Sequence, residues 1–321
     1  MPQLPRSLLL AACLTLPLGG QAAITFLFSY QDQIDATGFG FDDPTLGLTR
    51  RATVASVGDY LNTVLTGSGT VEIHWQTSMN NSGNGFLGQI SPYFPDASAP
   101  AGFYPSSMFT HAFDALDTTG PEDPDGLAVI NFGYNWNSDL GSPAGNEYDL
   151  FSVALHETVH GLGFMTLISS SGGYFTGFEG IRSTFDKYLQ GPGGSLLDAS
   201  GAFVGSVSDL TSGAVTFGGP AATAANGGQP VPIYSPVSFA SGSSLSHIAP
   251  SLPALMNPTL GTGIERRSLG GVELAMLQDM TAAATVPEPR DAALAAAVGL
   301  LTLAALRRRI ASSPPCPPSD T

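Results

Sequence analysis

Residues 152–164 read Ser-Val-Ala-Leu-His-Glu-Thr-Val-His-Gly-Leu-Gly-Phe, and this stretch predicts one helix that ends at a glycine. His156 and His160 are four residues apart, so both imidazole rings project from one helical face and can reach the same metal ion. Glu157 follows the first histidine and can polarise a water molecule at that metal without being a ligand. Apolar residues surround the motif, so we expect a buried helix whose histidines find their partner in a metal ion.

The N-terminal residues 1–23 predict a secretory signal peptide. Arg6 precedes an apolar run over residues 8–18, and small residues continue to Ala23, so cleavage is expected after Ala22 or Ala23. Residues 10–13, Leu-Ala-Ala-Cys, also match a bacterial lipoprotein box. Lipid attachment at Cys13 is therefore the alternative reading of this end of the chain.

The C-terminal residues 286–309 predict a membrane segment. Val286-Pro-Glu-Pro289 is followed by the largely apolar residues 292–306 and then by three arginines, Arg307 to Arg309. An apolar run of this length makes about 22 Å of helix, which is short for an unassisted span of roughly 30 Å. Arginines stay on the cytoplasmic side, so this order predicts a membrane segment with residues 24–285 outside the membrane. Residues 310–321 form a tail.

The composition of residues 24–285 excludes several classes of function. This stretch holds 6 basic and 23 acidic residues, which gives a net charge of −17. Nucleic acids and anionic lipid head groups are therefore excluded as expected partners, whereas calcium is a candidate cation. Both cysteines, Cys13 and Cys316, lie outside this stretch, so its stability must come from packing and bound metal instead of disulfides.

Hydrophobic periodicity predicts an α+β fold in which the helix with the histidines packs against a twisted, mixed sheet. Residues 80–126 are expected to form a loop with an acidic patch at 114–125, which could bind calcium or simply be solvated. Residues 172–242 are rich in glycine, serine and alanine and predict a less regular C-terminal subdomain. The expected strands are 24–30, 71–75, 127–134, 184–189 and 202–207, and the other expected helices are 44–65 and 271–283.

Two histidines leave a zinc ion one protein ligand short of its usual catalytic set. Three further histidines are available. His74 shares the polar face of a predicted strand and is expected to be solvent-exposed, and His111 lies in the predicted loop. His247 is followed by Leu255-Met-Asn-Pro258, where a methionine stands in a tight turn shortly after the histidine. A methionine placed in this way after a histidine resembles the Met-turn of metzincins.

The motif with its Gly161-Leu-Gly163 ending, a long insertion, His247 and the Leu-Met-Asn-Pro turn together resemble metzincins of the leishmanolysin type. The resemblance covers residues 147–167 and 245–282 well and the start of the domain loosely. It implies a zincin fold with a Met-turn, zinc held by His156, His160 and His247, Glu157 as general base, and Met256 beneath the metal.

The chain departs from the short-spaced metzincin motif, because Thr166 stands where the third histidine follows the glycine. No tyrosine follows Met256, so a tyrosine that stabilises the transition state is not evident. The rival third ligand is Glu179, at a spacing that resembles gluzincins such as thermolysin. Gluzincins lack both the Gly-Leu-Gly ending and the Leu-Met-Asn-Pro turn, which favours His247.

The C-terminal Pro-Glu-Pro, apolar run and arginine cluster resemble the PEP-CTERM sorting signal of Gram-negative bacteria. The resemblance implies transient anchoring in the inner membrane through this segment and processing near residue 287 by an exosortase-type enzyme. It also implies a location in the cell envelope or, after processing, outside the cell. Residues 310–321 continue further beyond the arginines than this signal usually does.

Two functions remain in competition. The first is an exported zinc endopeptidase that hydrolyses proteins or peptides with Glu157 as general base. The second is a non-catalytic binding protein of the envelope or biofilm matrix that keeps the zincin fold for stability. The presence of Glu157 favours the enzyme, because a purely structural zinc site has no use for a general base.

Overall fold

The structure is a computed structural model, and it describes residues 23–31, 38–79 and 85–284. The predicted membrane segment 286–309, the tail 310–321 and all but the last residue of the predicted signal peptide lie outside the described residues. In the ranges that are described, no helix has the length and apolar character needed to cross a membrane.

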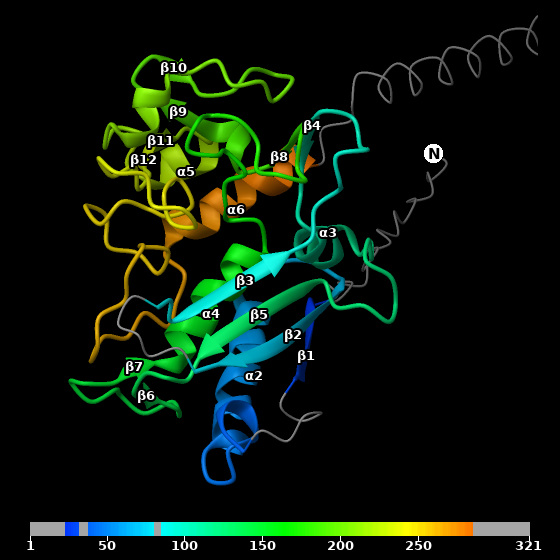
Figure 1. The fold of residues 1–321 in the computed structure, drawn as a ribbon, viewed down its shortest axis with the longest axis vertical. Helices are drawn as coiled ribbons and strands as arrows, with labels where there is room; N and C mark the ends of the chain where they lie inside the picture. The colour runs from blue at the N-terminus through cyan, green and yellow to red at the C-terminus, as the bar shows by residue number, and fades with distance from the viewer. Residues whose placement is uncertain (1–22, 32–37, 80–84, 285–321) are drawn as a thin grey trace, which may run out of the picture.

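The larger sheet has the strand order β1-β2-β5-β3. Strands β1 (Thr25–Tyr30), β2 (Thr70–Ser78) and β5 (Gly126–Asn131) are parallel, and β3 (Gly88–Pro92) is antiparallel to β5 at the edge of the sheet (Figure 1). The sheet is therefore mixed, and the three strands predicted in this part of the chain are confirmed. Edge strand β3 was not predicted.

Two helices cover one face of this sheet. Helices α2 (Gly47–Val64) and α4 (Leu150–Gly161) pack against each other, and they contact β1 and β3 respectively. On β2, Val71, Ile73 and Trp75 are buried, while the residues between them are only half-buried. This alternation is the pattern of a strand with one face on the core and one face towards solvent.

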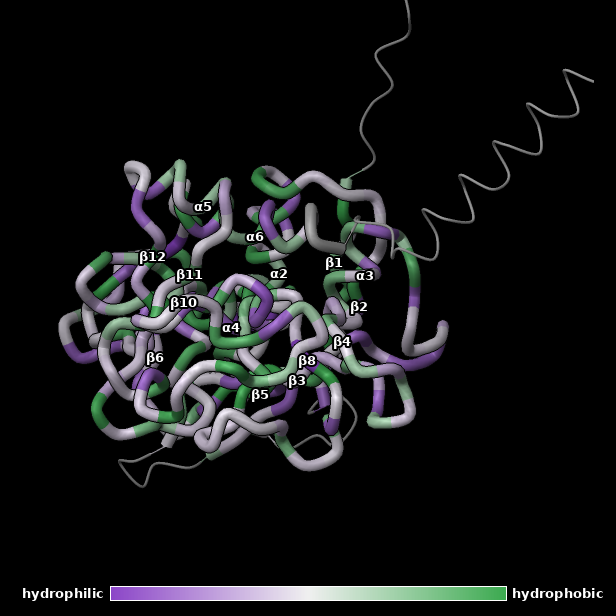
Figure 2. The backbone as a smooth tube through the Cα atoms, turned by 90° about the horizontal axis from the view of Figure 1, so that it is seen from above, coloured by the Kyte–Doolittle hydropathy of each residue, from purple (hydrophilic) through white to green (hydrophobic). Residues whose placement is uncertain are grey.

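Helix α4 carries the His-Glu-x-x-His motif and lies near the centre of the molecule when it is seen from above (Figure 2). It begins after Asp149, whose carboxylate accepts a hydrogen bond from the Ser152 N–H and so caps the first turn. The helix ends at Gly161, and Gly163 follows with a φ of +93°, a conformation that favours glycine. The predicted helix is confirmed, although it begins and ends two to three residues earlier than expected.

The expectation of a loop over residues 80–126 is wrong. This stretch contains β3, β4 (Gly102–Tyr104) and α3 (Ser107–Asp114). Helix α3 is short, and it forms because the Ser106 side chain caps it and because three of its apolar residues are buried, namely Met108, Phe109 and Ala112. Tertiary burial thus stabilises elements that are too short to give a periodic pattern.

In the C-terminal region, residues 172–242 are built from short elements, as expected, and the predicted helix 271–283 is confirmed as α6. A second sheet has the order β10-β9-β11-β12, and β8 pairs with β4. Helix α6 packs against α5 and joins the common core through Met276, Leu277 and Met280. The bounds are β8 Ile181–Ser183, β9 Leu189–Gly191, β10 Gly194–Ser195, β11 Thr216–Phe217, α5 Pro220–Ala225, β12 Val231–Pro232 and α6 Gly271–Ala284. The remaining short elements of the described chain are the pair β6 Trp136–Asn137 and β7 Tyr148–Asp149 and three 3-10 helices at Gly40–Asp42, Asp186–Tyr188 and Val207–Thr211.

Two strands predicted in this region are wrong. Residues 184–188 form a turn and a 3-10 helix, and only Leu189 belongs to a strand, β9. The turn forms because the buried Asp186 carboxylate accepts the Ser183 N–H while the Ser183 hydroxyl accepts the Asp186 N–H. Residues 202–207 make only one isolated bridge, between Leu197 and Phe203. The fold class is α+β, as predicted, with several sheets and the five helices α2 to α6 in the described ranges.

Candidate metal centre

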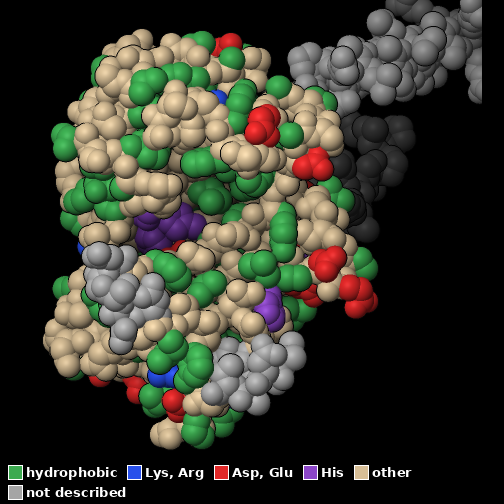
Figure 3. Space-filling model, in the orientation of Figure 1, with side chains coloured by type: hydrophobic (Ala, Val, Ile, Leu, Met, Phe, Trp, Pro, Cys, Tyr) green, Lys and Arg blue, Asp and Glu red, His purple; other side chains and the backbone are tan. Residues whose placement is uncertain are grey.

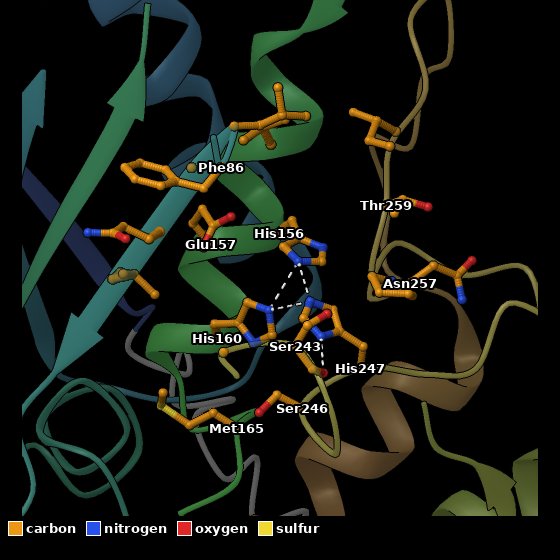
Figure 4. Close-up of a pocket in the computed structure, with 18 of the residues that line it drawn as sticks. Phe86, His156, Glu157, His160, Met165, Ser243, Ser246, His247, Asn257 and Thr259 are labelled. Carbon is orange, nitrogen blue, oxygen red and sulfur yellow. Dashed lines mark hydrogen bonds between the residues drawn. The ribbon is translucent and has the colours of Figure 1, made fainter. Parts of the chain in front are cut away.

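Three histidine rings meet between α4 and the loop that carries His247. The His156 and His160 Nε2 atoms are 3.0 Å apart, and the His247 Nε2 lies 3.2 Å and 3.1 Å from them. Figure 4 shows the three rings pointing towards one another. By their mutual distances these side chains form a group that could hold a metal ion. The structure therefore brings together all three residues that the sequence suggests as ligands.

The second nitrogen of each ring determines what the Nε2 atoms can do. His156 Nδ1 lies 2.9 Å from the Leu255 carbonyl oxygen, His160 Nδ1 lies 2.6 Å from that of Phe164, and His247 Nδ1 lies 2.7 Å from that of Ser243. A carbonyl only accepts, so each Nδ1 must carry the proton, and each neutral ring then presents Nε2 as an acceptor. Three acceptors that face one another cannot hydrogen-bond. A cation between them satisfies all three lone pairs.

Burial keeps these rings neutral. Desolvation lowers the pKa of His156 to about 3 and that of His247 to about 4, and it lowers the pKa of His160 well below the ordinary 6.5. The neighbouring imidazoles add to the effect on His156 and His160, because two positive rings at this distance repel each other. Neutral imidazole is the form that ligates a metal ion.

Glu157 lies on the next position of α4, between β3 and the histidines (Figure 4). Its side chain lines the cleft, and desolvation raises the pKa of its carboxyl group to about 8. Within the part of the chain that the structure describes, no donor hydrogen-bonds this carboxylate. The absence of a side chain at Gly88 of β3 leaves room for the Glu157 side chain, because a Cβ atom there would lie 2.8 Å from Glu157 Cγ. Glu157 is outside the group of three ligand atoms and is available to act as a base.

A cleft of about 930 Å³ opens at this centre. In the space-filling view the histidine side chains lie in a hollow that hydrophobic side chains border (Figure 3). Edge strand β3 and the residues just before it form one wall, and residues 239–260 contribute to the opposite wall. Apart from the three histidines and Glu157, every lining residue is uncharged.

The loop that carries His247 is held by specific hydrogen bonds. The Asn257 side-chain amide donates to the carbonyl oxygens of Ile248, Ala249 and Leu252, and its oxygen accepts from the Ala254 N–H. Leu245, two residues before His247, is buried with a φ of +66°. A left-handed leucine is strained, and such conformations occur where surrounding structure fixes a functional segment.

The rival ligand does not belong to this centre. Glu179 is exposed, and its carboxylate accepts a hydrogen bond from the nearby Gly177 N–H. Thr166 is buried and donates to Asp186, so it takes a structural role at the position where the short-spaced motif has a histidine.

The other two histidines lie elsewhere. His74, expected to be exposed, is half-buried on β2 and hydrogen-bonds Ser29. His111 is in the last turn of α3 and not in a loop, and its Nδ1 pairs with the buried Asp125 carboxylate at 2.8 Å. Together with Asp117 these two residues form a second group with metal-binding distances, which includes part of the acidic patch. The Glu72 N–H also bonds Asp125, so this carboxylate already has partners.

Several residues that build the centre were not found from the sequence. The three carbonyl oxygens that orient the rings carry no sequence signal, because any residue supplies a carbonyl. Asp149, which caps α4, could have been found from the preference for aspartate at the residue before a helix. Glu273 of α6 accepts a hydrogen bond from the Met256 N–H. The sequence indicates it only weakly, as the third residue of a helix that follows a glycine.

In the comparisons with known proteins, no protein family and no curated protein matches this sequence.

Proposed function

We propose that this chain is a zinc-dependent endopeptidase with a zincin fold and a metzincin-type third ligand. The observation that carries the proposal is the convergence of three acceptor nitrogens beside a buried carboxylate in an open cleft. The mixed sheet packed on α4 and the tight turn at the buried Met256 support the same assignment.

The three residues fit a zinc ion. Zinc binds imidazole nitrogen at about 2.0–2.1 Å, and tetrahedral geometry then separates two nitrogens by about 3.3 Å. The observed separations of 3.0–3.2 Å differ little from this value. Three neutral imidazoles with a fourth position left for water or substrate are a ligand set of catalytic zinc sites.

When bound, zinc supplies Lewis acidity, which favours attack by water on a peptide carbonyl. Glu157 accepts the proton of the attacking water at its carboxylate and returns it to the leaving amine. The Glu157 side chain is buried beside the ligands, so little solvent competes for the proton between the two transfers. The backbone carbonyls on the three Nδ1 atoms keep the rings oriented during these steps.

The cleft suits an extended, uncharged peptide segment. Strand β3 pairs with β5 on one side only, and within the described residues its other edge faces no strand. A peptide can add to such an edge through main-chain hydrogen bonds. Because no lysine, arginine or aspartate lines the cleft, neutral side chains next to the scissile bond avoid an unpaired buried charge.

The decisive experiment compares the wild type with Glu157→Ala on an unstructured protein such as casein. Both proteins should bind about one zinc ion per chain, since Glu157 is not a ligand. The variant should be slower by roughly 10²- to 10⁴-fold, which is the usual contribution of a general base. Chelation should abolish the activity of the wild type, and added zinc should restore it.

Equal activity of the two proteins would show that Glu157 is not the base. Bound zinc without any activity in the wild type would favour the alternative, a non-catalytic binding protein of the envelope or matrix.

The ligand set has its own test. His247→Ala should lose zinc as severely as His156→Ala, whereas Glu179→Ala should retain it, because Glu179 is exposed and remote from the group of ligand atoms. Zinc content of the purified proteins measures this. Retention of zinc by His247→Ala together with its loss from Glu179→Ala would overturn the metzincin-type assignment.

Export remains part of the proposal. The signal peptide and the C-terminal sorting segment lie outside the described residues, so they rest on the sequence alone. The net charge of −17 and the lack of cysteine in residues 24–285 are compatible with an exported domain that relies on bound metal and packing.

A further inference from the structure

The three ligand histidines differ in how their Nδ1 partners are held. The Phe164 carbonyl lies four residues after His160, and the Ser243 carbonyl lies four residues before His247. Both partners are therefore fixed by the local turn. The Leu255 carbonyl, in contrast, is 99 residues away from His156. The orientation of His156 thus depends on whatever fixes the peptide group between residues 255 and 256.

Glu273 of α6 holds the other side of this peptide group. Its Oε1 accepts a hydrogen bond from the Met256 N–H at 2.8 Å, while the carbonyl of the same peptide unit accepts from His156 Nδ1 at 2.9 Å. A peptide group is planar and rigid, so an acceptor on its N–H also sets the direction of its C=O. A carboxylate on the N–H also polarises the peptide and makes its oxygen a stronger acceptor.

The carboxylate itself is fixed at both ends. Oε2 of Glu273 accepts the Gly270 N–H at 2.6 Å, at the start of its own helix. The residue is 2 % exposed, so water does not compete for these bonds. One continuous set of hydrogen bonds therefore links α6 to the metal centre, and it runs through Gly270, Glu273, the 255–256 peptide and His156.

We propose that Glu273 is a positioning residue for the metal centre, which orients and polarises the Leu255–Met256 peptide and thereby fixes His156 as a ligand. The inference rests on the proposed function in so far as the three histidines bind zinc. Groups that fix a ligand histidine through its second nitrogen typically contribute 10- to 100-fold in metal affinity.

Asp279 on the same helix provides a matched control. It is also 2 % exposed, and its carboxylate also accepts two backbone N–H groups, those of Ala221 and Ala222 at 2.9 Å each. These bonds lead to α5 and not to the metal centre. A merely structural role for Glu273 would make the two carboxylates equivalent in their effect on zinc.

The test measures the zinc dissociation constant of the full chain by competition with a chelator, for the wild type, Glu273→Gln, Glu273→Ala and Asp279→Asn. We expect affinity to fall about 10- to 100-fold in Glu273→Ala and less in Glu273→Gln, which keeps one acceptor oxygen. Asp279→Asn should lower the unfolding midpoint without changing zinc affinity. The absorption spectrum of the cobalt-substituted protein should change in the Glu273 variants only, because the spectrum reports ligand geometry.

The outcomes separate the two proposals. Wild type that binds no zinc would refute the proposed function and this inference with it. Wild type that binds zinc, with folded Glu273 variants whose affinity is within about twofold of it, would refute the role of Glu273 alone. Equal losses of affinity in Glu273→Gln and Asp279→Asn would refute it as well, since they would show that any lost carboxylate on α6 has the same effect. Glu273→Gln has nearly the same shape as the wild type and serves if Glu273→Ala does not fold.

Discussion

The two sides of the cleft are constructed by different means. On the helix side, which comprises α4 and the larger sheet, two ligands and Glu157 project from a regular helix that is buried against β3 and β5. On the loop side, which comprises residues 165–189 and 239–260, His247 lies in a segment of turns that side-chain hydrogen bonds hold in place.

The two sides of the cleft are therefore stabilised by different interactions. Burial of apolar side chains stabilises the helix side and depends little on any single hydrogen bond. The loop side depends on a few buried carboxylates and amides whose loss leaves backbone donors without partners. Damage to the helix side should therefore lower global stability and leave metal affinity intact, whereas damage to the loop side should lower both.

Replacing Trp75 by alanine should have the largest effect. The side chain is fully buried on β2 and contacts the rings of Phe28 and Phe41 edge-on. Loss of a buried tryptophan costs about 3–5 kcal/mol of unfolding free energy. Denaturant unfolding measures this cost, and zinc competition on the folded fraction should give the wild-type affinity. A parallel loss of zinc affinity would break the proposed separation between the two sides.

Asp186→Ala tests the loop side and should cost about 3 kcal/mol. The buried carboxylate accepts from the Thr166 hydroxyl and from the N–H groups of Leu167 and Ser183. Each buried donor left without a partner costs roughly 1–3 kcal/mol, and relaxation recovers part of the sum. Thr166 and Leu167 line the cleft, so zinc affinity should fall together with stability. A variant that unfolds earlier but binds zinc normally would contradict the comparison.

The isosteric variant Asp186→Asn adds a pH signature. Burial raises the pKa of Asp186 above its ordinary 3.8, so the folded state keeps its proton to a higher pH than the unfolded state does. The contribution of this group to stability must then decrease as pH rises from 3.8 through the raised pKa. Asparagine cannot titrate, so the free energy of unfolding of the variant should not show this decrease with pH. Unfolding curves recorded at several pH values in the acidic range measure it.

Gly88→Ala should reduce activity about tenfold, which corresponds to about 1.4 kcal/mol in the barrier. The added Cβ would lie 2.8 Å from Glu157 Cγ and 3.0 Å from a methyl group of Val153, so the Glu157 side chain, the proposed general base, must move. Zinc content should not change. Gly102→Ala on β4 is the control, because its Cβ would meet its nearest atom at 3.8 Å. Casein cleavage at equal zinc occupancy checks both variants, and equal rates for the two would contradict a steric role of Gly88.

Trp75→Phe should have the smallest effect, below about 1 kcal/mol. The indole Nε1 is buried, and it has no hydrogen-bond partner within the described residues. The lost volume is therefore offset by removal of a buried donor that was not satisfied. Trp136→Phe is the matched comparison, since its Nε1 donates to the Asn131 carbonyl at 2.9 Å and its loss should cost more. Chemical denaturation of both variants decides, and a larger loss for Trp75→Phe would contradict this account.

The same contrast explains what could be read from the sequence. Strands β1, β2 and β5 and the helices α2 and α6 follow from the pattern of apolar residues, because each is long enough to repeat its pattern. Helix α4 follows from its histidine motif and its glycine ending. The His-Glu-x-x-His spacing indicates two metal ligands and a base directly from helical geometry. His247 came from a resemblance that includes the turn at Met256, and not from periodicity.

The remaining elements could not be predicted because the residues that stabilise them are distant in the sequence. Edge strand β3 exists through its pairing with β5, and α3 exists through its burial. The 3-10 helix at Asp186 replaces a predicted strand because the Asp186 carboxylate accepts hydrogen bonds from the nearby Ser183 N–H and from the distant Leu167 N–H. Such bonds depend on tertiary position, and local propensity does not encode them.

The separation of His156 and His247 along the chain has a consequence for the order of assembly. Their Nε2 atoms meet across 91 residues, so His247, the proposed third ligand, reaches the other two histidines only after a long loop has closed. Contacts of this kind form late and slow the folding of a domain. A peptide that spans α4 alone offers two of the three nitrogens. Under the proposed function, tight zinc capture reports the completed fold. Free zinc then raises the free energy of unfolding in proportion to the logarithm of its concentration, once that concentration exceeds the dissociation constant.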